Sequence, residues 1–594
     1  MNDAGSEAKR DTDRNVPLSV SLGEYAGAVR AALEAAARAN VIERIWNKDA
    51  TLWKNEVAHQ KIIANSLGWL TVPSEMLEVA DELKTFAEGV SASGFQQVMV
   101  CGMGGSSLCP EVLRQTFGRQ KGFPELLVLD STDPDTINNF KKQIDIGKCL
   151  FVIASKSGTT TEPITFHRYW YNEVAQSSDA PGDAFVTITD PGSQMADTAA
   201  AEGFRRIFLN QPDIGGRYSA LSYFGMVPAA LMGVDAARLL RQTQAMVEAC
   251  GARAAVDQNP AAMLGAVLAE CARAGRDKLT IVTDHKLAVL GLWVEQLIAE
   301  STGKEGKGVV PIVGEPLGEV SAYGSDRLFI SISVGPIDEE TNSRLKALEA
   351  AGHPVVYRSL GEVYDLGAEF FLWEMATAFA GWRLAINPFD QPNVQESKDA
   401  TKALLEKYKR EGKLPEQPAL ARDDQLTVYA GGEVGSSMAS SLVREALQTH
   451  CAQIKPGDYV ALLAYVEETP ETEAALQKIR TSIRDATHCA TTTGYGPRFL
   501  HSTGQLHKGG PASGVFVQIT APDKIDFPVP GAAYTFSILK DGQALGDFQS
   551  LLKHDRRAIR VDLGADALIG LAKLQELIDS IVAENKRAGA SPPS

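Results

Sequence analysis

The sequence predicts an α/β protein with two doubly wound parallel sheets, an N-terminal helical segment and a C-terminal α/β extension. Two observations predict this fold class. Short apolar runs alternate with helix-length segments, as in parallel sheets with right-handed crossovers. Two of these runs also end in loops rich in glycine or hydroxyl groups that lead into a helix. The expected strands lie at 97–101, 126–130, 150–154 and 185–189, and again at 279–283, 327–334 and 354–357.

The chain of 594 residues has room for several domains of ordinary size. We expect an N-terminal helical segment over 1–55, a first α/β domain over 56–250 and a second over 251–408. The two α/β domains share no detectable sequence repeat. The second domain alternates its strands with expected helices at about 286–300, 337–351 and 367–384.

The C-terminal part shows weaker signals. Residues 409–424 are charged and contain proline, which indicates a linker. We expect a further α/β portion over 425–585, with strands at 459–465 and 514–519 and a helix at 471–486. Polar composition predicts disorder over residues 1–15 and in the small-residue tail from Lys586.

Composition excludes several classes of protein. A hydrophobic content of 44% and a charged content of 22% are those of a globular protein. The net charge of −16 argues against nucleic acid as a partner, and no apolar run approaches the length of a membrane span. The polar N-terminus indicates no signal peptide, and seven cysteines without a C-x-x-C pair indicate reduced thiols in a cytoplasm.

The stretch from Leu150 to Pro163 is the strongest local signal. An apolar strand is followed by Ser155-Lys156-Ser157-Gly158-Thr159-Thr160, and Glu162-Pro163 is typical of the first turn of a helix. Backbone N–H groups at a helix N-terminus attract anions, and the hydroxyls and Lys156 would add donors. From this stretch alone, an N-capped turn with a solvated lysine is an equally good interpretation.

A second strand, at 98–101, leads into Gly102-Met103-Gly104-Gly105-Ser106-Ser107. The loop is not a dinucleotide fingerprint, because Ser107 stands where the third glycine belongs. It is not a Walker A loop either, because no Gly-Lys-Ser/Thr follows. Loops after neighbouring parallel strands can face one site at the carboxyl edge of a sheet.

Together the two loops resemble the sugar-phosphate pocket of the glucose-6-phosphate isomerase family, which has the sugar isomerase (SIS) fold. The resemblance implies two SIS-type domains and a small sugar-phosphate substrate. It also implies that six residues hold the phosphate: Gly105, Ser106, Ser155, Lys156, Ser157 and Thr160.

Residues 213–219, Asp-Ile-Gly-Gly-Arg-Tyr-Ser, match a further signature of this family. The glycines let the backbone approach a ligand, and Arg217 offers a fixed fork of donors. The resemblance implies that Arg217 stabilises the negative charge of an enediolate. An exposed arginine in a tight turn is the alternative.

Glu300-Ser301-Thr302-Gly303-Lys304 follows an apolar run and places Glu300 near the end of a buried helix. A carboxylate there is partly desolvated, which strengthens it as a base. The resemblance implies that Glu300 moves a proton between C1 and C2 of the sugar. Without this context it would be an ordinary helix-end glutamate.

Residues 387–398 resemble the family's second signature, and the resemblance implies functional roles for Gln391 and Lys398. Two residues depart from it. Asn393 replaces a glycine, a mild change because asparagine tolerates left-handed backbone angles. Gln395 replaces a glutamate, which leaves the pairing of Lys398 open, and Glu396 could compensate.

The family also has a histidine between the base and the second signature, but here the corresponding stretch is Gly367-Ala368-Glu369-Phe370-Phe371. His501-Ser-Thr-Gly-Gln505 resembles the missing segment and implies a rearranged lineage, similar to the isomerase half of fused transaldolase–glucose-6-phosphate isomerase proteins. A histidine suits acid–base exchange at neutral pH, so His501 is predicted to open the sugar ring, rather than His507. Capping or solvent-facing roles for both histidines are the alternative.

The resemblance implies an enzyme that interconverts glucose 6-phosphate and fructose 6-phosphate in glycolysis and gluconeogenesis, with a homo-oligomer as the expected assembly. No metal or cofactor is implied, because no histidine, cysteine or carboxylate set has ligand spacing. Three alternatives stay open: a sugar-phosphate-sensing SIS regulator, an isomerase that also takes mannose 6-phosphate, and a variant linked to transaldolase. A regulator would need the phosphate loops but not Arg217, Glu300 and Lys398.

Overall fold

The computed structural model describes residues 18–431 and 442–589. The chain divides into two compact units. Unit 1 takes in 1–130, 144–302 and 328–390, and unit 2 takes in 131–143, 303–327 and 391–594. No helix in the described part of the chain is long and apolar enough to cross a membrane.

The first sheet of unit 1 has the strand order β3-β2-β4-β5-β6, and every neighbouring pair is parallel. Its strands are β2 (Gln97–Cys101), β3 (Glu125–Leu129), β4 (Cys149–Ala154), β5 (Phe185–Thr189) and β6 (Arg206–Leu209). Its crossover and neighbouring helices are α7 (Gly105–Phe117), α9 (Thr161–Ala175), α10 (Gln194–Ala201) and α11 (Tyr223–Leu231). The chain adds β3 on one side of β2 and adds β4, β5 and β6 on the other side, which makes the sheet doubly wound.

The core of this sheet centres on β4, all six residues of which are buried. The ring of Phe151 stacks on Trp170 of α9 at 5.3 Å between centroids and on Phe185 of β5 at 5.1 Å. Stacked aromatic pairs bury large apolar areas. The end of β4, where the hydroxyl-rich loop begins, is therefore held by a rigid aromatic core.

The second sheet of unit 1 contains the strands β1-β10-β9-β7 in that order. Strands β9 and β10 are parallel, whereas β1 adds an antiparallel edge. The strands are β1 (Ser19–Ser21), β7 (Lys278–Thr283), β9 (Arg327–Val334) and β10 (Val355–Leu360). The helices that go with them are α12 (Ala236–Ala249), α13 (Pro260–Arg273), α14 (Leu290–Thr302), α15 (Glu339–Ala350) and α16 (Leu366–Leu384).

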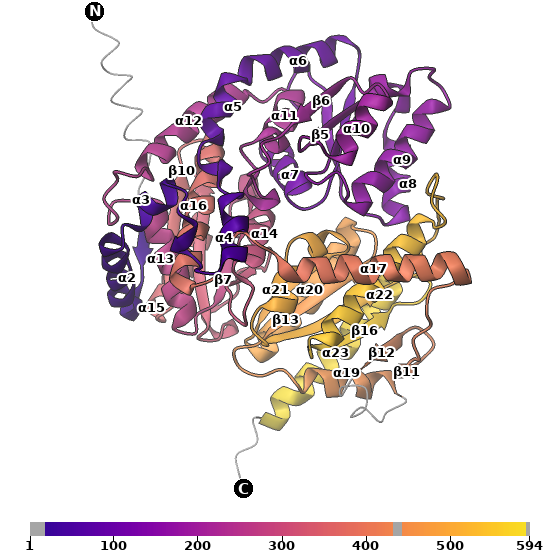
Figure 1. The fold of residues 1–594 in the computed structure, drawn as a ribbon. Coiled ribbons are helices and arrows are strands. Elements are labelled where there is room, and N and C mark those ends of the chain that lie inside the picture. The colour runs from indigo at the N-terminus through magenta and orange to yellow at the C-terminus, as the bar shows by residue number, and fades with distance from the viewer. Residues whose placement is uncertain (1–17, 432–441, 590–594) are drawn as a thin grey trace, which may run out of the picture. The chain divides into compact units, whose positions relative to one another are not determined.

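Helix α16 is the central helix of this part and is buried along nearly its whole length. It packs against α12, α13 and α14, which surround it in Figure 1. A helix that is apolar on all sides is expected in such a position. The remaining helices of unit 1 lie at its N-terminal end: α2 (Ala26–Arg38), α3 (Val41–Trp46), α4 (Val57–Ala64), α5 (Val72–Glu78) and α6 (Ala80–Ala92).

Unit 2 has its own six-stranded sheet, of order β11-β12-β16-β15-β13-β14. Strands β14, β13, β15 and β16 are parallel, and β12 and β11 extend the sheet antiparallel. The strands are β11 (Ala421–Arg422), β12 (Thr427–Ala430), β13 (Tyr459–Tyr465), β14 (Ala490–Tyr495), β15 (Gly514–Thr520) and β16 (Arg557–Asp562), and the short β8 (Val310–Ile312) is also assigned to this unit. The core combines β-branched residues of these strands with leucine and isoleucine of the helices.

The helices of unit 2 are α8 (Pro134–Gln143), α17 (Pro392–Glu411), α19 (Val443–Cys451), α20 (Pro470–Thr487), α21 (Gly504–Gly509), α22 (Phe536–Lys553) and α23 (Ala567–Gly589). Helix α17 packs along α22, and α20 along α23, as Figure 1 shows in orange and yellow. The predicted fold class is confirmed: two parallel α/β sheets follow an N-terminal helical segment, and an α/β extension follows them. The four expected domain boundaries stay predictions.

Several details differ from the expectation. The predicted linker begins inside α17, which ends at Glu411 because Gly412 caps it with a φ of 70°, and it overlaps β11. Strand β6 was not predicted, because its only apolar residues are the three at 207–209, which follow two arginines. The expected disordered residues 1–15 lie outside the described residues, as does most of the tail after Lys586.

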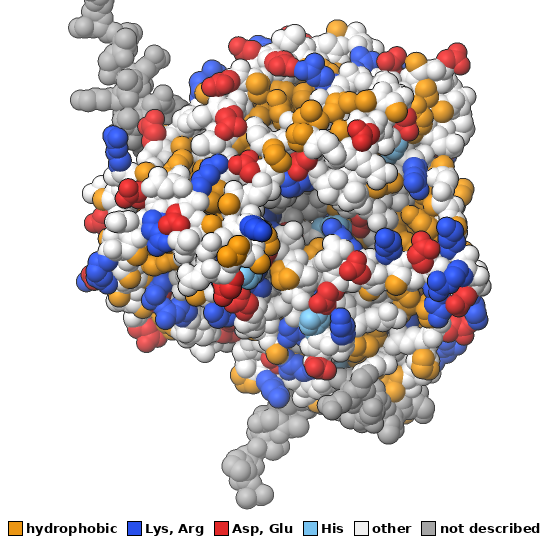
Figure 2. All heavy atoms as spheres, viewed as in Figure 1, with side chains coloured by type: hydrophobic (Ala, Val, Ile, Leu, Met, Phe, Trp, Pro, Cys, Tyr) orange, Lys and Arg blue, Asp and Glu red, His pale blue; other side chains and the backbone are white. Residues whose placement is uncertain are grey.

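The surface carries charges of both signs. On the face shown in Figure 2, acidic and basic side chains are interspersed with apolar ones. A mixed surface is typical of globular proteins with a net charge away from zero.

Candidate active site

The loop after β2 meets the turn that carries Arg217. Gly104 has a φ of 57° at the N-terminus of α7, and a Cβ on Gly105 would lie 1.8 Å from the carbonyl oxygen of Gly216. No side chain fits at that distance, so residue 105 must be glycine. The close approach fixes the first predicted phosphate loop against the arginine turn.

The loop after β4 lies on the strand next to β2, with Ile153 paired to Cys101. Gly158 has a φ of 65°, and its N–H donates to the carbonyl of Ser155. Ser155 Oγ and Thr160 Oγ1 are 3.3 Å apart, and α9 begins at Thr161 as the sequence predicts. The two loops therefore end neighbouring parallel strands at one carboxyl edge, which is where ligands bind in such sheets.

The ammonium group of Lys156 is held by two hydrogen-bond acceptors rather than projecting freely into solvent. Its Nζ donates to Asp190 Oδ2 at 2.5 Å and to the carbonyl oxygen of Pro212 at 2.8 Å. Burial raises the pKa of Asp190, and the ion pair with Lys156 opposes that rise. Asp190 therefore orients the lysine and offsets part of its charge.

Arg217 lies in a short 3₁₀ turn, Gly216–Tyr218, and is only 3% exposed. Its Nε donates to Ser301 Oγ at 2.7 Å. Its Nη2 donates to the carbonyl oxygens of Pro388 at 2.7 Å and Asp390 at 3.0 Å. These bonds hold the guanidinium plane rigidly, which suits a group that must stabilise charge without rearranging.

Glu300 faces the third nitrogen of the same guanidinium. The distance from Glu300 Oε2 to Arg217 Nη1 is 3.6 Å, and the Glu300 side chain is 10% exposed. Gln296, one turn earlier in α14, donates to Glu300 Oε2 at 3.3 Å. The structure thus brings together the predicted base and the predicted enediolate-stabilising arginine, on α14 and on the turn after β6.

Tyr218, the neighbour of Arg217 in the turn, is buried and contacts Ser301 and Trp69. Its hydroxyl lies 3.4 Å from Ser301 Oγ, and its ring stacks on Trp69 at 5.5 Å. Burial raises the pKa of Tyr218, although the charge of Arg217 opposes the rise. The tyrosine therefore stays a neutral hydrogen-bond donor.

Asp390, whose carbonyl oxygen accepts a hydrogen bond from Arg217, also contacts a histidine through its side chain. The sequence analysis did not predict this contact. His59 Nδ1, on α4, lies 3.2 Å from Asp390 Oδ2. Asn387 Nδ2 lies 3.1 Å from the same carboxylate oxygen. No linear motif surrounds His59, so only the proximity of α4 to residues 387–390 could reveal the contact.

The other predicted site residues belong to unit 2. Gln391 precedes α17, which carries Lys398, and both are exposed. Asn393 is the second residue of α17 rather than a left-handed residue, and its amide N–H and side chain bond to Gln505. The part of the second signature from Gln391 onward and the segment after His501 therefore lie together within unit 2.

The two departures from the second signature have structural partners. Gln395 donates to Asp399 Oδ1 at 2.8 Å. Glu396 contacts His554 Nε2 at 2.6 Å. Glu396 therefore pairs with a histidine of unit 2.

The two histidines of the loop differ in environment. His501 ends a 3₁₀ turn, Arg498–His501, and is partly exposed. His507 is 2% exposed and packs against Phe516 at 5.1 Å. Burial lowers the pKa of His507 well below its usual value, and the charges of Lys508 and Arg556 add to this. His507 is therefore a neutral core residue.

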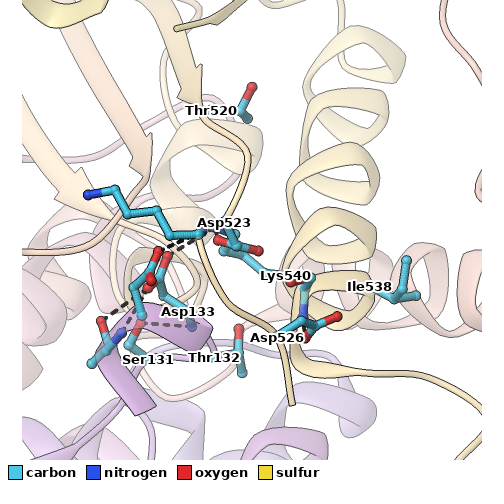
Figure 3. A network of polar contacts seen from close by, with 12 residues as sticks. Ser131, Thr132, Asp133, Thr520, Asp523, Asp526, Ile538 and Lys540 are labelled. Atoms are coloured by element: carbon cyan, nitrogen blue, oxygen red, sulfur yellow. Dashed lines mark hydrogen bonds and ion pairs between the residues drawn. The ribbon is translucent and has the colours of Figure 1, made fainter. Parts of the chain in front are cut away.

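One group of described residues has the spacing of metal ligands: Asp133, Asp135 and Asp523 of unit 2. Figure 3 shows that Lys540 reaches into this group. Its Nζ donates to Asp133 Oδ2 at 2.9 Å and forms a second ion pair with Asp523. Burial raises the pKa of Asp523 to about 6, against the effect of Lys540. A single ammonium group thus forms ion pairs with two of the three carboxylates.

Comparisons with known proteins agree with the fold. A protein of undefined function from Thermus thermophilus has a TM-score of 0.56 and 24% identity, over 65% of this chain and 99% of its own. A glucose-6-phosphate isomerase from Chlamydia trachomatis has a TM-score of 0.53 and 17% identity, over 67% and 89%. The fold and the loops define an α/β protein with doubly wound parallel sheets and two loops at one carboxyl edge.

The sequence comparisons are more specific. Residues 56–319 match the family model of phosphoglucose isomerase. A glucose-6-phosphate isomerase from Parabacteroides distasonis is 28% identical over 397 residues, 58% of this chain and 88% of its own. A probable glucose-6-phosphate isomerase from Methanococcus maripaludis is 24% identical over 387 residues, 58% and 85%. The match over residues 56–319 confirms the resemblance to the phosphoglucose isomerase family. The finer likeness to fused transaldolase proteins stays a prediction.

Proposed function

We propose that this protein is an aldose–ketose isomerase that interconverts glucose 6-phosphate and fructose 6-phosphate. The observation that carries the proposal is the 3.6 Å approach of Glu300 Oε2 to Arg217 Nη1, with both side chains largely buried. A sugar-phosphate sensor has no need of a buried base beside a fixed cation. Two relatives that align with 58% and 57% of this chain are named glucose-6-phosphate isomerase.

The proposed chemistry is proton transfer through a cis-enediolate. Glu300 takes the proton from C2 of the open-chain aldose, the electron pair forms the C1–C2 double bond, and O1 becomes negative. Glu300 then returns the proton to C1 while the hydroxyl proton of O2 moves to O1, which leaves the ketose. Arg217 stabilises the intermediate charge, and its fixed hydrogen bonds keep the cost of reorganisation low.

The phosphate is held at the two loops in this proposal. Ser155, Ser157 and Thr160 offer hydroxyl groups, and Gly105 and Ser106 offer backbone N–H groups near the start of α7. Lys156 offers a charge that Asp190 orients. Charge-assisted hydrogen bonds of this kind are among the strongest that a protein makes.

The roles of the unit 2 residues rest on the family resemblance. Gln391 and Lys398 would bind and polarise the sugar, and His501 would exchange protons during ring opening. The cellular setting is proposed on the same basis: a cytoplasmic enzyme of glycolysis and gluconeogenesis, without nucleic acid or membrane partners, and as a homo-oligomer.

A coupled assay tests the proposal. Purified protein is mixed with fructose 6-phosphate, and the glucose 6-phosphate formed is oxidised by a dehydrogenase that reduces NADP. We expect turnover that Glu300→Gln abolishes and that Glu339→Gln, a change on the exposed first turn of α15, leaves intact. Tight binding of fructose 6-phosphate without turnover would contradict the proposal and favour a sensor.

A further inference from the structure

We propose that His59, oriented by Asp390, is an acid–base residue that opens the sugar ring. The inference rests on the proposed isomerase function and adds a residue that neither the family motifs nor the sequence signals assign. All of the residues that carry it belong to unit 1, the unit that also holds Arg217 and Glu300.

The position that holds a histidine in the family is closed to acid–base chemistry here. Glu369 stands in its place, and its Oε2 accepts from Arg358 Nε at 2.7 Å. Its Oε1 accepts from Trp373 Nε1 at 2.9 Å, and the residue is 0% exposed. A carboxylate fixed in this way cannot reach a substrate, so ring opening needs a group from elsewhere in the chain. The family resemblance gives this role to His501, whereas the contacts within unit 1 favour His59.

The contact between His59 and Asp390 favours a tautomer in which Nε2 of the imidazole is available as a base. Asn387 Oδ1 accepts from the N–H of Phe389 at 3.0 Å, which turns the Asn387 amino group toward Asp390 Oδ2. The Asp390 carboxylate therefore receives one hydrogen bond from Asn387 and can receive a second from His59 Nδ1 at 3.2 Å. Asn387 Nδ2 lies 3.2 Å from the same ring nitrogen and can donate to it in the other tautomer. With the proton on Nδ1, Nε2 carries the basic lone pair. A carboxylate that fixes the tautomer of a histidine is the arrangement that general bases use.

The dyad is also linked directly to the proposed chemical centre. The carbonyl oxygen of Asp390 accepts from Arg217 Nη2 at 3.0 Å, and Arg217 Nη1 faces Glu300. Trp53 packs edge-on against Phe389 at 5.1 Å and donates to the carbonyl of Ala378 at 2.9 Å, which fixes the segment beneath the dyad. The His59 side chain is 32% exposed, so it is open to a ligand, whereas the Asp390 side chain is 12% exposed.

The step that we assign to His59 is the first one of the reaction. Nε2 takes the proton of the anomeric hydroxyl, the bond between the anomeric carbon and the ring oxygen breaks, and a carbonyl group forms. The ring oxygen takes the bonding electron pair and a proton from water, and the resulting hydroxide takes the proton back from His59. The reverse sequence closes the ring on the ketose side.

Anomer exchange separates ring opening from isomerisation. The α and β anomers of glucose 6-phosphate interconvert when the ring opens and closes, and this needs no proton transfer at carbon. Exchange spectroscopy by NMR measures the rate with wild-type protein, Glu300→Gln, His59→Asn and, as a matched control, His285→Asn at an exposed site of unit 1.

We expect Glu300→Gln and His285→Asn to accelerate anomer exchange as the wild type does. His59→Asn should slow it by about a hundredfold, the usual scale for losing a general base. Asp390→Ala should slow it partly and Asp390→Asn less, because an amide oxygen can still accept from Nδ1. Melting temperatures within about 2 °C of the wild type establish that the variants are folded.

Two outcomes would overturn the assignment: normal anomer exchange in His59→Asn, or an equal loss in Glu300→Gln and His59→Asn. Failure of the proposed function would look different, because the wild-type protein itself would not convert fructose 6-phosphate in the coupled assay. If a protein without isomerase activity still accelerated anomer exchange, and His59→Asn removed that acceleration, the ring-opening role of His59 would hold although the proposed isomerase function had failed.

Discussion

Arg358 and Glu369 form a fully buried ion pair, with Arg358 Nε donating to Glu369 Oε2 at 2.7 Å. The pair joins β10 to α16 within the core of unit 1. It occupies the place where the sequence lacks the histidine of the family. If this correspondence with the family holds, Glu369 has a structural role, because Arg358 and Trp373 bind both of its carboxylate oxygens.

The role of Glu300 is tested by Glu300→Gln, which keeps the shape of the side chain and removes the base. We expect turnover to fall by about a hundredfold or more, with little change in KM, because the phosphate loops are untouched. Steady-state kinetics in the coupled assay measure both quantities. Turnover near that of the wild type would mean that another group is the base.

The role of Lys156 is tested by Lys156→Ala. We expect KM for fructose 6-phosphate to rise about tenfold or more with a smaller change in kcat, because a hydrogen bond to a charged group is lost. Asp190→Asn serves as the control, since it removes the carboxylate that the lysine contacts and keeps the lysine. An unchanged KM in Lys156→Ala would leave residues 155–161 as a capped turn.

The two histidines of the 501–507 segment should respond differently. The family resemblance predicts that His501→Ala slows turnover of the cyclic substrate strongly, whereas ring opening by His59 predicts little change. His507→Ala is expected to lower the melting temperature and to change kcat little, because the His507 ring is buried against Phe516 and Tyr459. Kinetics and thermal unfolding of both variants make the comparison. Equal turnover in the two variants would contradict a ring-opening role for His501.

Activity should persist in EDTA, because Arg217 can neutralise an enediolate without a Lewis acid. The coupled assay after dialysis against EDTA tests this. A reversible loss that a divalent cation restores would refute it. Asp523→Asn would then tell whether the carboxylate group at Asp133 and Asp135 is responsible.

Stability should depend on pH through Glu374 of α16, which is fully buried and whose two carboxylate oxygens have no hydrogen-bond partner among the described residues. Burial raises its pKa well above the usual value. A carboxyl with a raised pKa in the folded state contributes stability below its unfolded pKa, near 4.5, and loses it as the pH rises. Glu374→Gln does not titrate.

We therefore expect the melting temperature of Glu374→Gln, relative to the wild type, to increase as the pH is raised from about 4.5 toward neutrality. Glu339→Gln, at an exposed position, provides the baseline for removing one acid. A difference that stays constant with pH would mean that Glu374 keeps the same protonation state when the protein unfolds.

Local sequence determined the parallel sheets and the loops at their edges. The apolar runs at 97–101 and 150–154, and the glycine or hydroxyl residues after them, are short-range patterns set by strand burial and turn chemistry. The expected strands at 185–189, 327–334 and 459–465 coincide with β5, β9 and β13. The position of Glu300 near the end of a buried helix follows from the apolar run of α14 in the same way.

Only the tertiary structure decided which side chains meet. Arg217, Glu300 and Pro388 are distant in sequence, and their contacts depend on how the helices of unit 1 pack rather than on any local pattern. The same holds for His59, which has no motif around it and gains a partner only because α4 lies beside residues 387–390. Local patterns carry the periodicity of burial, whereas contacts between distant residues depend on the packing of the whole unit, so the sequence predicted loops and sheets but not the histidine–aspartate contact.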